Sequence, residues 1–204
     1  MMRWFSIFMV LGLMAAEPAE AQDGAQDGVQ VGAQAGPQSV AGVTLPAAAT
    51  VGDKKLRLQG GYLLRYKLFF KIYVAALYLP EGTGEQAALG EVPRRIEFHY
   101  QRALTAAQLV EATNGTINRG RDDVAIAQIA SQVAAFNLLY PDVSAGDVMT
   151  IDYQPDRGTT MLINNVERGT IVGSDFSRAL FGIWIGEHSF DPELKAALLG
   201  TTNP

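Results

Sequence analysis

The sequence contains no cysteine and only two histidines among its 204 residues. The lack of cysteine excludes disulfides, thiolate metal sites and cysteine nucleophiles, and two histidines make a zinc site of the common kind hard to assemble. Acidic residues outnumber basic ones by 21 to 16, which argues against a nucleic-acid binder, because such proteins need a basic surface to neutralise phosphates. The 48% of hydrophobic residues suits one globular domain.

An export signal is predicted at the N-terminus. Arg3 precedes the apolar residues 4–16, and Ala19-Glu20-Ala21 offers a small-x-small cleavage site. The apolar run is shorter than the about 20 residues that span a bilayer, so a signal peptide over residues 1–21 is favoured over a transmembrane anchor. No later stretch is long and apolar enough to span. We therefore expect cleavage after Ala21 and a periplasmic or secreted protein without a membrane span.

Residues 22–38 are of low complexity, with glycine at every fourth position from Gly24 to Gly36 and glutamine recurring between them. Glycine at this density opposes a helix, and the segment has no large side chain to bury. It is predicted to be a flexible tether that precedes a folded domain over residues 39–204.

Two stretches of this domain are predicted to be long strands. Residues 68–79 are long enough for a helix, but their β-branched and aromatic composition and the Pro80-Glu81-Gly82 boundary favour a strand. Residues 95–102 alternate, with Ile96, Phe98 and Tyr100 on the face expected to be buried.

Helices and a second group of strands follow. The helices are expected after Thr105, after Asp122 or Asp123, after Gly173 and after Asp191, and strands are expected within residues 148–171, with a tight turn at Asn164-Asn165. Strands grouped in blocks and joined by hairpins make an antiparallel sheet. We therefore expect an α+β domain in which an antiparallel β-sheet has its helices packed on one face.

Spacing alone identifies no catalytic residue, because GxSxG, P-loop and HExxH motifs are absent, and no cofactor is expected. The remaining feature is a group of basic residues in the apolar segment 60–73, taken as one extended strand. Arg65, Lys71 and Tyr73 would then share a face because their spacings are even. A guanidinium against apolar walls binds carboxylates and oxyanions through two charge-assisted hydrogen bonds, and a tyrosine hydroxyl can donate a third. The alternative is a strand-end Arg65 that reaches into water.

Four segments in order resemble the chalcone isomerase-like family. They are residues 60–80, 94–109, 136–153 and 168–186. The resemblance implies an open-faced sandwich with a ligand cleft between the sheet and the helices. The family contains cofactor-free enzymes that cyclise chalcones and non-catalytic members that bind fatty acids, and the export signal favours a bacterial, exported member.

The resemblance also implies site residues. Arg65 falls at the position of the arginine that stabilises the substrate oxyanion in the enzymes, and Tyr73 at that of a threonine that polarises the carbonyl. Arginine paired with tyrosine is similar to the fatty-acid binders. Leu109 and Thr116 fall at the positions of a helix tyrosine and asparagine of the enzymes, and Thr170 at that of a later threonine. Leucine in place of tyrosine removes a donor and adds apolar surface, which suits a binding pocket better than turnover.

Three functions follow from these residues. The first is a binding protein for a small hydrophobic or amphipathic ligand such as a fatty acid, with Arg65, Lys71, Tyr73, Thr116 and Thr170 as ligand-binding residues. The second is a cofactor-free isomerase, an intramolecular lyase acting on a chalcone-like conjugated substrate. The third is a scaffold protein with a vestigial cleft. The sequence leaves the ligand and the oligomeric state open.

Overall fold

The computed structural model describes residues 36–67 and 69–201. The predicted signal peptide, residues 1–21, and most of the predicted tether, residues 22–38, lie outside the described residues, although Gln38 is already part of the first strand. The strands are β1 (Gln38–Val40), β2 (Val43–Leu45), β3 (Ala48–Val51), β4 (Lys54–Tyr66), β5 (Phe70–Leu79), β6 (Arg94–Tyr100), β7 (Val148–Gln154), β8 (Gly158–Ile163) and β9 (Val166–Ile171). The helices are α1 (Ala106–Thr116), α2 (Asp123–Asn137), α3 (Ser174–Ile185), α4 (Pro192–Leu198) and the short 3-10 helix η1 (Glu85–Ala87).

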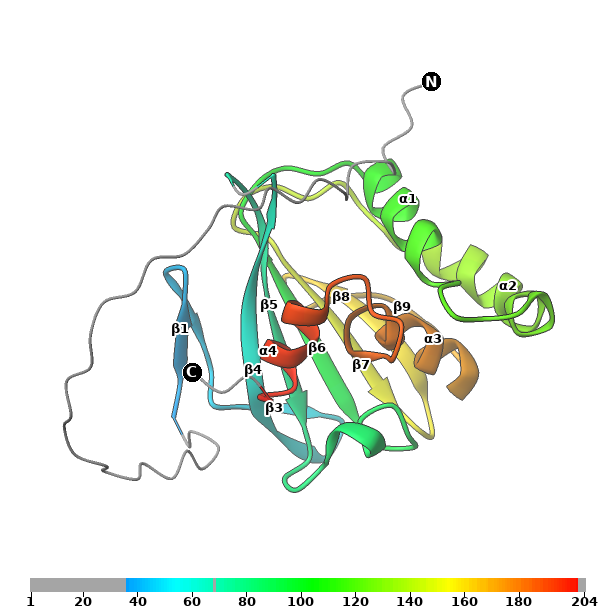
Figure 1. Ribbon diagram of the computed structural model, residues 1–204, viewed down its shortest axis with the longest axis horizontal. Helices are drawn as coiled ribbons and strands as arrows, with labels where there is room; N and C mark the ends of the chain where they lie inside the picture. The colour runs from blue at the N-terminus through cyan, green and yellow to red at the C-terminus, as the bar shows by residue number, and fades with distance from the viewer. Residues whose placement is uncertain (1–35, 68, 202–204) are drawn as a thin grey trace, which may run out of the picture. The chain divides into compact units, whose positions relative to one another are not determined.

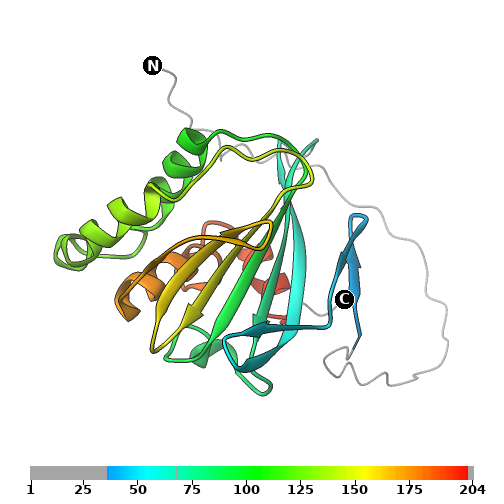
Figure 2. The same ribbon diagram turned by 180° about the vertical axis from the view of Figure 1, so that it is seen from behind.

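Strands β3 to β9 form one antiparallel sheet in sequence order, and β1 and β2 form a separate hairpin. The sheet curls strongly, since β3 contacts β6 and β7 and Gly52, in the turn after β3, lies against Gln154 of β7 (Figure 1). The α-helices pack on one face of the sheet (Figure 2). Helices α1 and α2 lie between β6 and β7 in the sequence, although these two strands are paired neighbours in the sheet. The predicted α+β architecture is confirmed. None of the helices between residues 36 and 201 combines the length and apolar content that a membrane span requires.

Local sequence signals set several element ends. The Thr105 side chain accepts from the Gln108 backbone while Gln108 bonds back to Thr105, which forms a capping box at the start of α1. Asp122 and Asp191 cap α2 and α4 through their side chains. Asn164 and Asn165 both adopt positive φ in the turn between β8 and β9. This conformation is the one that a two-residue hairpin turn demands and that asparagine tolerates.

Two hydrophobic clusters lie on opposite faces of the sheet. The larger fills the space between the sheet and the helices, and β5 contributes alternate residues to it, among them Ala75 and Leu77. The smaller contains Val74, Ala76 and Tyr78 from the opposite face of β5, together with residues of β2, β3 and β4. The β1–β2 hairpin covers this second cluster, because Val40 and Val43 pack against it. The sequence patterns predicted the first cluster and not the second.

The expectation of one continuous strand over residues 60–73 is wrong. The chain reverses between β4 and β5, where Lys67 has a φ of 48°. Arg65 and Lys71 are therefore opposite each other on paired strands instead of spaced along one strand. The register shifts between Leu64 and Arg65, which interrupts the side-chain alternation on which the shared face was predicted.

Arg94 is the largest fully buried side chain, with 1% of its surface exposed. Its Nη1 donates to the carbonyls of Ala88 and Gly90 at 3.2 and 2.7 Å, and its Nη2 donates to Ser177 Oγ at 2.7 Å. The rings of Tyr153 and Phe181, in the core between the sheet and the helices (the helix-side core), have their centres 4.2 and 4.8 Å from the guanidinium carbon. Burial lowers the pKa of Arg94 to about 10. Arg94 thus ties the loop after β5 to α3.

Candidate functional site

Tyr73 lies on the face of β5 that the helices cover. Its hydroxyl accepts a hydrogen bond of 3.2 Å from Nε1 of Trp184 on α3. Its ring packs edge-on against Phe98 and Tyr100 of β6, with centroids 5.0 and 6.1 Å away. Phe98 in turn contacts Trp184 at 4.8 Å. These four side chains form an aromatic cluster that carries two phenol hydroxyls inside an otherwise apolar layer.

A second pair of hydroxyls adjoins this cluster. Thr113 of α1 and Tyr140, just after α2, share a hydrogen bond of 2.8 Å between their oxygens, and both residues are buried. Burial raises the pKa of Tyr140 to about 12 and also raises the pKa of Tyr73 and of Tyr100. All three phenols therefore stay neutral near pH 7 and can donate hydrogen bonds.

Arg65 and Lys71 lie at the end of the β4–β5 hairpin beside this cluster. Both side chains are exposed, as the alternative prediction for Arg65 had it. Their backbones are paired, and the next pair along the hairpin is Leu64 with Tyr73. Leu64 and Tyr73 both pack against the helix-side core, so Arg65, the next residue of β4, and its partner Lys71 start from the opposite face of the sheet. The structure therefore brings Arg65, Lys71 and Tyr73 to one end of the hairpin but does not place Arg65 on the same face as Tyr73.

Thr116 is only half-buried on α1, and its hydroxyl donates to the backbone carbonyls of Ala112 and Thr113 at 2.7 and 3.2 Å. It lies three residues after Thr113 and seven after Leu109, which places the three on one side of the helix. Leu109 packs against the helix-side core. Thr113, which sequence analysis did not select, is the polar residue that this side of α1 presents to Tyr140.

Thr170 lies on the other face of the sheet. Its hydroxyl is 2.8 Å from that of Thr160 on β8 and donates to Glu167 at 3.2 Å. Met161, the neighbour of Thr160, belongs to the helix-side core, and successive side chains of a strand point to opposite faces. Thr170 and Thr160 therefore face away from Tyr73, and the structure does not bring Thr170 to the aromatic cluster.

The same far face carries a network of charged side chains. Arg95 donates to both carboxylate oxygens of Asp152 at 2.6 and 2.7 Å and lies 3.6 Å from Glu97. Glu97 also lies 3.3 Å from His99 Nε2. Burial raises the pKa of Asp152, and the bond to Arg95 counters that effect. Each charge in this network has a partner of opposite or complementary kind, which is the arrangement that makes partly buried charges tolerable.

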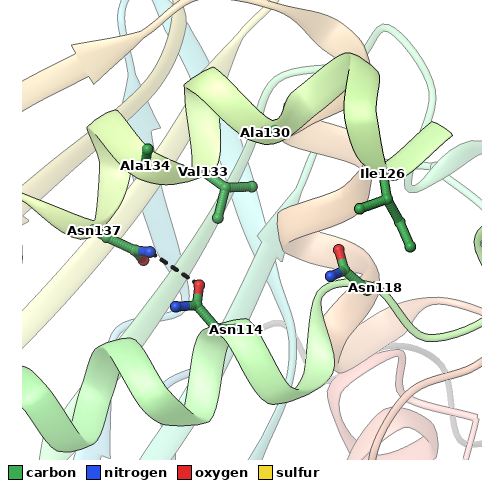
Figure 3. A pocket seen from close by; sticks show the side chains of 7 residues that line it. All are labelled: Asn114, Asn118, Ile126, Ala130, Val133, Ala134 and Asn137. Atoms are coloured by element: carbon green, nitrogen blue, oxygen red, sulfur yellow. Dashed lines mark hydrogen bonds between the residues drawn. The ribbon is translucent and has the colours of Figure 1, made fainter. Parts of the chain in front are cut away.

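A pocket of about 220 Å³ lies between α1 and α2 (Figure 3). Asn137 donates to Asn114 at 2.9 Å across it. Its lining residues are Asn114, Asn118, Ile126, Ala130, Val133, Ala134 and Asn137. None of the residues predicted from the sequence lines this pocket.

The site residues that were not predicted from the sequence are Trp184, Tyr100, Tyr140 and Thr113. Tyr100 and Tyr140 had a visible signal, because each sits in an apolar stripe where a hydroxyl needs a partner. Trp184 had the same signal in α3. No sequence pattern indicated that these side chains meet, since Trp184 and Tyr73 are 111 residues apart.

Comparison with known proteins agrees with this architecture. The chalcone isomerase-like family model matches residues 37–200. The crystal structure of a fatty-acid binding protein from Arabidopsis thaliana superposes with a TM-score of 0.59 over 78% of this chain and 92% of that chain, at 15% identity, which shows a shared fold. No curated protein matches the sequence. Because the family model spans most of its length, the chain belongs to the chalcone isomerase-like family.

Proposed function

We propose that this domain is an exported binding protein for a small amphipathic acid, most simply a fatty acid, held between the sheet and the helices. The observation that carries the proposal is the position of the Tyr73 hydroxyl. It lies in an apolar and aromatic layer, next to the strand pair that carries Arg65 and Lys71. An acid with a long apolar tail needs this combination of a few polar anchors and an extended apolar wall.

The head group would be bound by a neutral donor and a cation. In its hydrogen bond with Trp184, the Tyr73 hydroxyl is the acceptor, which leaves its proton for a carboxylate oxygen. The raised pKa of Tyr73 keeps that proton in place. Arg65 and Lys71 start from the exposed far face at the end of the hairpin, so their long side chains would have to reach round that end to place a guanidinium and a second positive charge at the carboxylate. Hydrogen bonds to charged groups are stronger than neutral ones, so Tyr73 is expected to matter measurably.

The tail would lie along aliphatic side chains that are only partly buried. These residues pack against the helix-side core without being fully enclosed by it. They are Leu64 of β4, Leu104 before α1, Leu109 of α1, Leu139 after α2 and Ile163 of β8. Contact with a tail would remove their remaining apolar surface from water. That burial is favourable by roughly 25 cal/mol per Å².

The test is a titration of the purified protein with palmitate, followed by calorimetry and by Trp184 fluorescence, because Trp184 bonds directly to Tyr73. We expect Tyr73→Phe and Arg65→Ala each to weaken palmitate binding about tenfold or more. Arg57→Ala is the matched control, since Arg57 is also an exposed arginine of β4 and pairs with Glu81. Hexadecanol, which has the tail without the carboxylate, should bind weakly and should respond little to Arg65→Ala.

Three results would contradict the proposal. One is the absence of any co-purifying lipid in native mass spectrometry together with no thermal shift on adding palmitate. Another is palmitate binding that Tyr73→Phe and Arg65→Ala leave unchanged. The third is ring closure of a chalcone, measured spectrophotometrically and lost in Arg65→Ala, which would favour the isomerase function instead.

A further inference from the structure

The end of the β4–β5 hairpin exposes aromatic side chains to solvent. Phe69 and Phe70 have 83% and 52% of their surface exposed, and Tyr66 has 40%. The hairpin projects beyond the strand ends at which the chain leaves β6 for α1 (Figures 1 and 2). Phe69 in particular is almost fully exposed, so its apolar ring contributes little to the core of the domain. Their exposure therefore points to a surface contact.

Cations surround these rings. Lys67 lies 5.4 Å from the centre of the Tyr66 ring, and Arg102, from the loop after β6, lies 5.8 Å from that of Phe70. Lys71 is exposed next to Phe70. Every charged residue from position 54 to position 80 is lysine or arginine, in a chain whose formal charge is -5. The hairpin end is thus a local basic site on an acidic protein.

Two acidic residues of the described chain lie near this end of the strands: Asp142, whose carboxylate accepts from the amide of Ala106 at 2.8 Å, and Asp147. Asp147 accepts, through its backbone carbonyl, from the amide of Tyr100 at 2.9 Å. Its carboxylate is held by the amide of Ser144 at 2.7 Å and by Nδ2 of Asn164 at 2.9 Å, toward the β8–β9 turn. These bonds hold the carboxylate, which keeps its negative charge, toward the β8–β9 turn.

We propose that the hairpin end, defined as Lys67, Phe69, Phe70, Lys71 and Arg102, docks onto an anionic lipid surface. The aromatic rings would enter the boundary between head groups and acyl chains, while the cations contact lipid phosphates. Charge complementarity and the projecting shape both favour a bilayer over a protein partner. A stable protein interface buries about 800 Å² on each side, and the other large exposed hydrophobic residues among those described lie on or beside α2 and β9: Val124, Leu138, Val166 and Val172.

The experiment is flotation of the full chain with two kinds of vesicle. One contains phosphatidylcholine alone, and the other contains equal parts of phosphatidylcholine and phosphatidylglycerol. All variants keep the same N-terminal residues, so any contribution of that segment is common to them. We expect binding to the anionic vesicles that weakens as salt rises, that falls about tenfold in Phe69→Ser, and that falls about fivefold in Lys71→Ala.

Two matched controls lie elsewhere on the surface. Leu138→Ser removes a side chain that is 85% exposed, much as Phe69 is, and Lys55→Ala removes an exposed lysine at the opposite end of β4. Both should bind vesicles like the unaltered protein. Phe69→Trp adds a direct readout, since brominated lipids should quench its emission. Thermal unfolding checks that each variant folds.

The proposal fails if the protein does not float with anionic vesicles, or if Phe69→Ser and Leu138→Ser bind alike. It also fails if Phe69 is needed for self-association in sedimentation and not for flotation, which would make the hairpin end an interface between copies. Palmitate binding in solution is measured without vesicles. Either this proposal or the fatty-acid proposal can therefore fail while the other stands.

Discussion

The hydrogen bond between Tyr73 and Trp184 offers a sharp test of the candidate site. Tyr73→Phe removes the acceptor of the 3.2 Å bond and keeps the ring contacts with Phe98 and Tyr100. Trp184 has 8% of its surface exposed, so its N–H has little access to water. A buried donor without a partner costs about 1–3 kcal/mol. The variant also no longer has to bury the phenol hydroxyl, and this gain offsets part of that cost. We expect Tyr73→Phe to lower the free energy of unfolding by about 1–2 kcal/mol.

A double-mutant cycle isolates the bond from packing. Trp184→Phe should cost more than Tyr73→Phe, because it also loses indole contacts. The double variant should cost less than the sum of the two single variants by about 1 kcal/mol. Urea unfolding followed by circular dichroism measures this coupling without relying on tryptophan emission, and about 1 kcal/mol corresponds to roughly 2–4 °C in Tm for a chain of this size.

The control for the cycle is Thr170→Val, whose hydroxyl bonds to Thr160 on the opposite face of the sheet. Thr170→Val and Trp184→Phe should be additive, because they share no partner. If Tyr73 and Trp184 proved additive as well, the hydrogen bond would contribute nothing measurable. The assignment of Tyr73 as a pre-oriented donor for a carboxylate would then lose its basis.

Three further outcomes are expected. Burial raises the pKa of Tyr140 to about 12, so the native state holds the phenol proton after the unfolded chain has released it near pH 10. About 3 kcal/mol of stability is therefore present below pH 10 and should be lost as the pH rises toward 12. Unfolding curves measured as a function of pH should show a smaller loss for Tyr140→Phe. Arg94→Ala should lower the free energy of unfolding by about 3–5 kcal/mol, because it leaves two buried carbonyls and a serine hydroxyl without their donor, and a change below about 1 kcal/mol in urea unfolding would contradict that role. Gly60→Ala should destabilise the contact between β4 and α4, because a Cβ at position 60 would meet the carbonyl of Ala197. In Gly182→Ala the added Cβ in α3 meets nothing, so this variant should be more stable by up to about 1 kcal/mol. Equal melting temperatures of the two variants would show that α4 does not pack this closely.

Several features of this protein were predictable because short-range chemistry decides them. A threonine or aspartate before an apolar repeat caps a helix through its own side chain, and Thr105 and Asp122 do so. Two asparagines in succession accept positive φ and therefore mark the β8–β9 turn. Alternation in β6 placed Phe98 and Tyr100 in the core.

Other features depended on residues far apart in the sequence. The turn between β4 and β5 has no glycine, proline or asparagine to mark it, so an apolar segment with a lysine at positive φ resembled one long strand. Arginine is usually exposed, and only the carbonyls, hydroxyl and rings gathered around Arg94 make its burial possible.

The sequence by itself determined the strand β6, the helices after Thr105, Asp122, Gly173 and Asp191, the Asn164-Asn165 turn, and the residue types available for binding an acid. The tertiary structure decided which of those residues meet. It set Arg65 beside Lys71 by pairing two strands, joined Tyr73 to Trp184 across the sheet–helix layer, and turned Thr170 to the opposite face. The reason is physical: caps and turns are settled within a few residues, whereas strand register and helix packing depend on burying apolar surface across the whole domain.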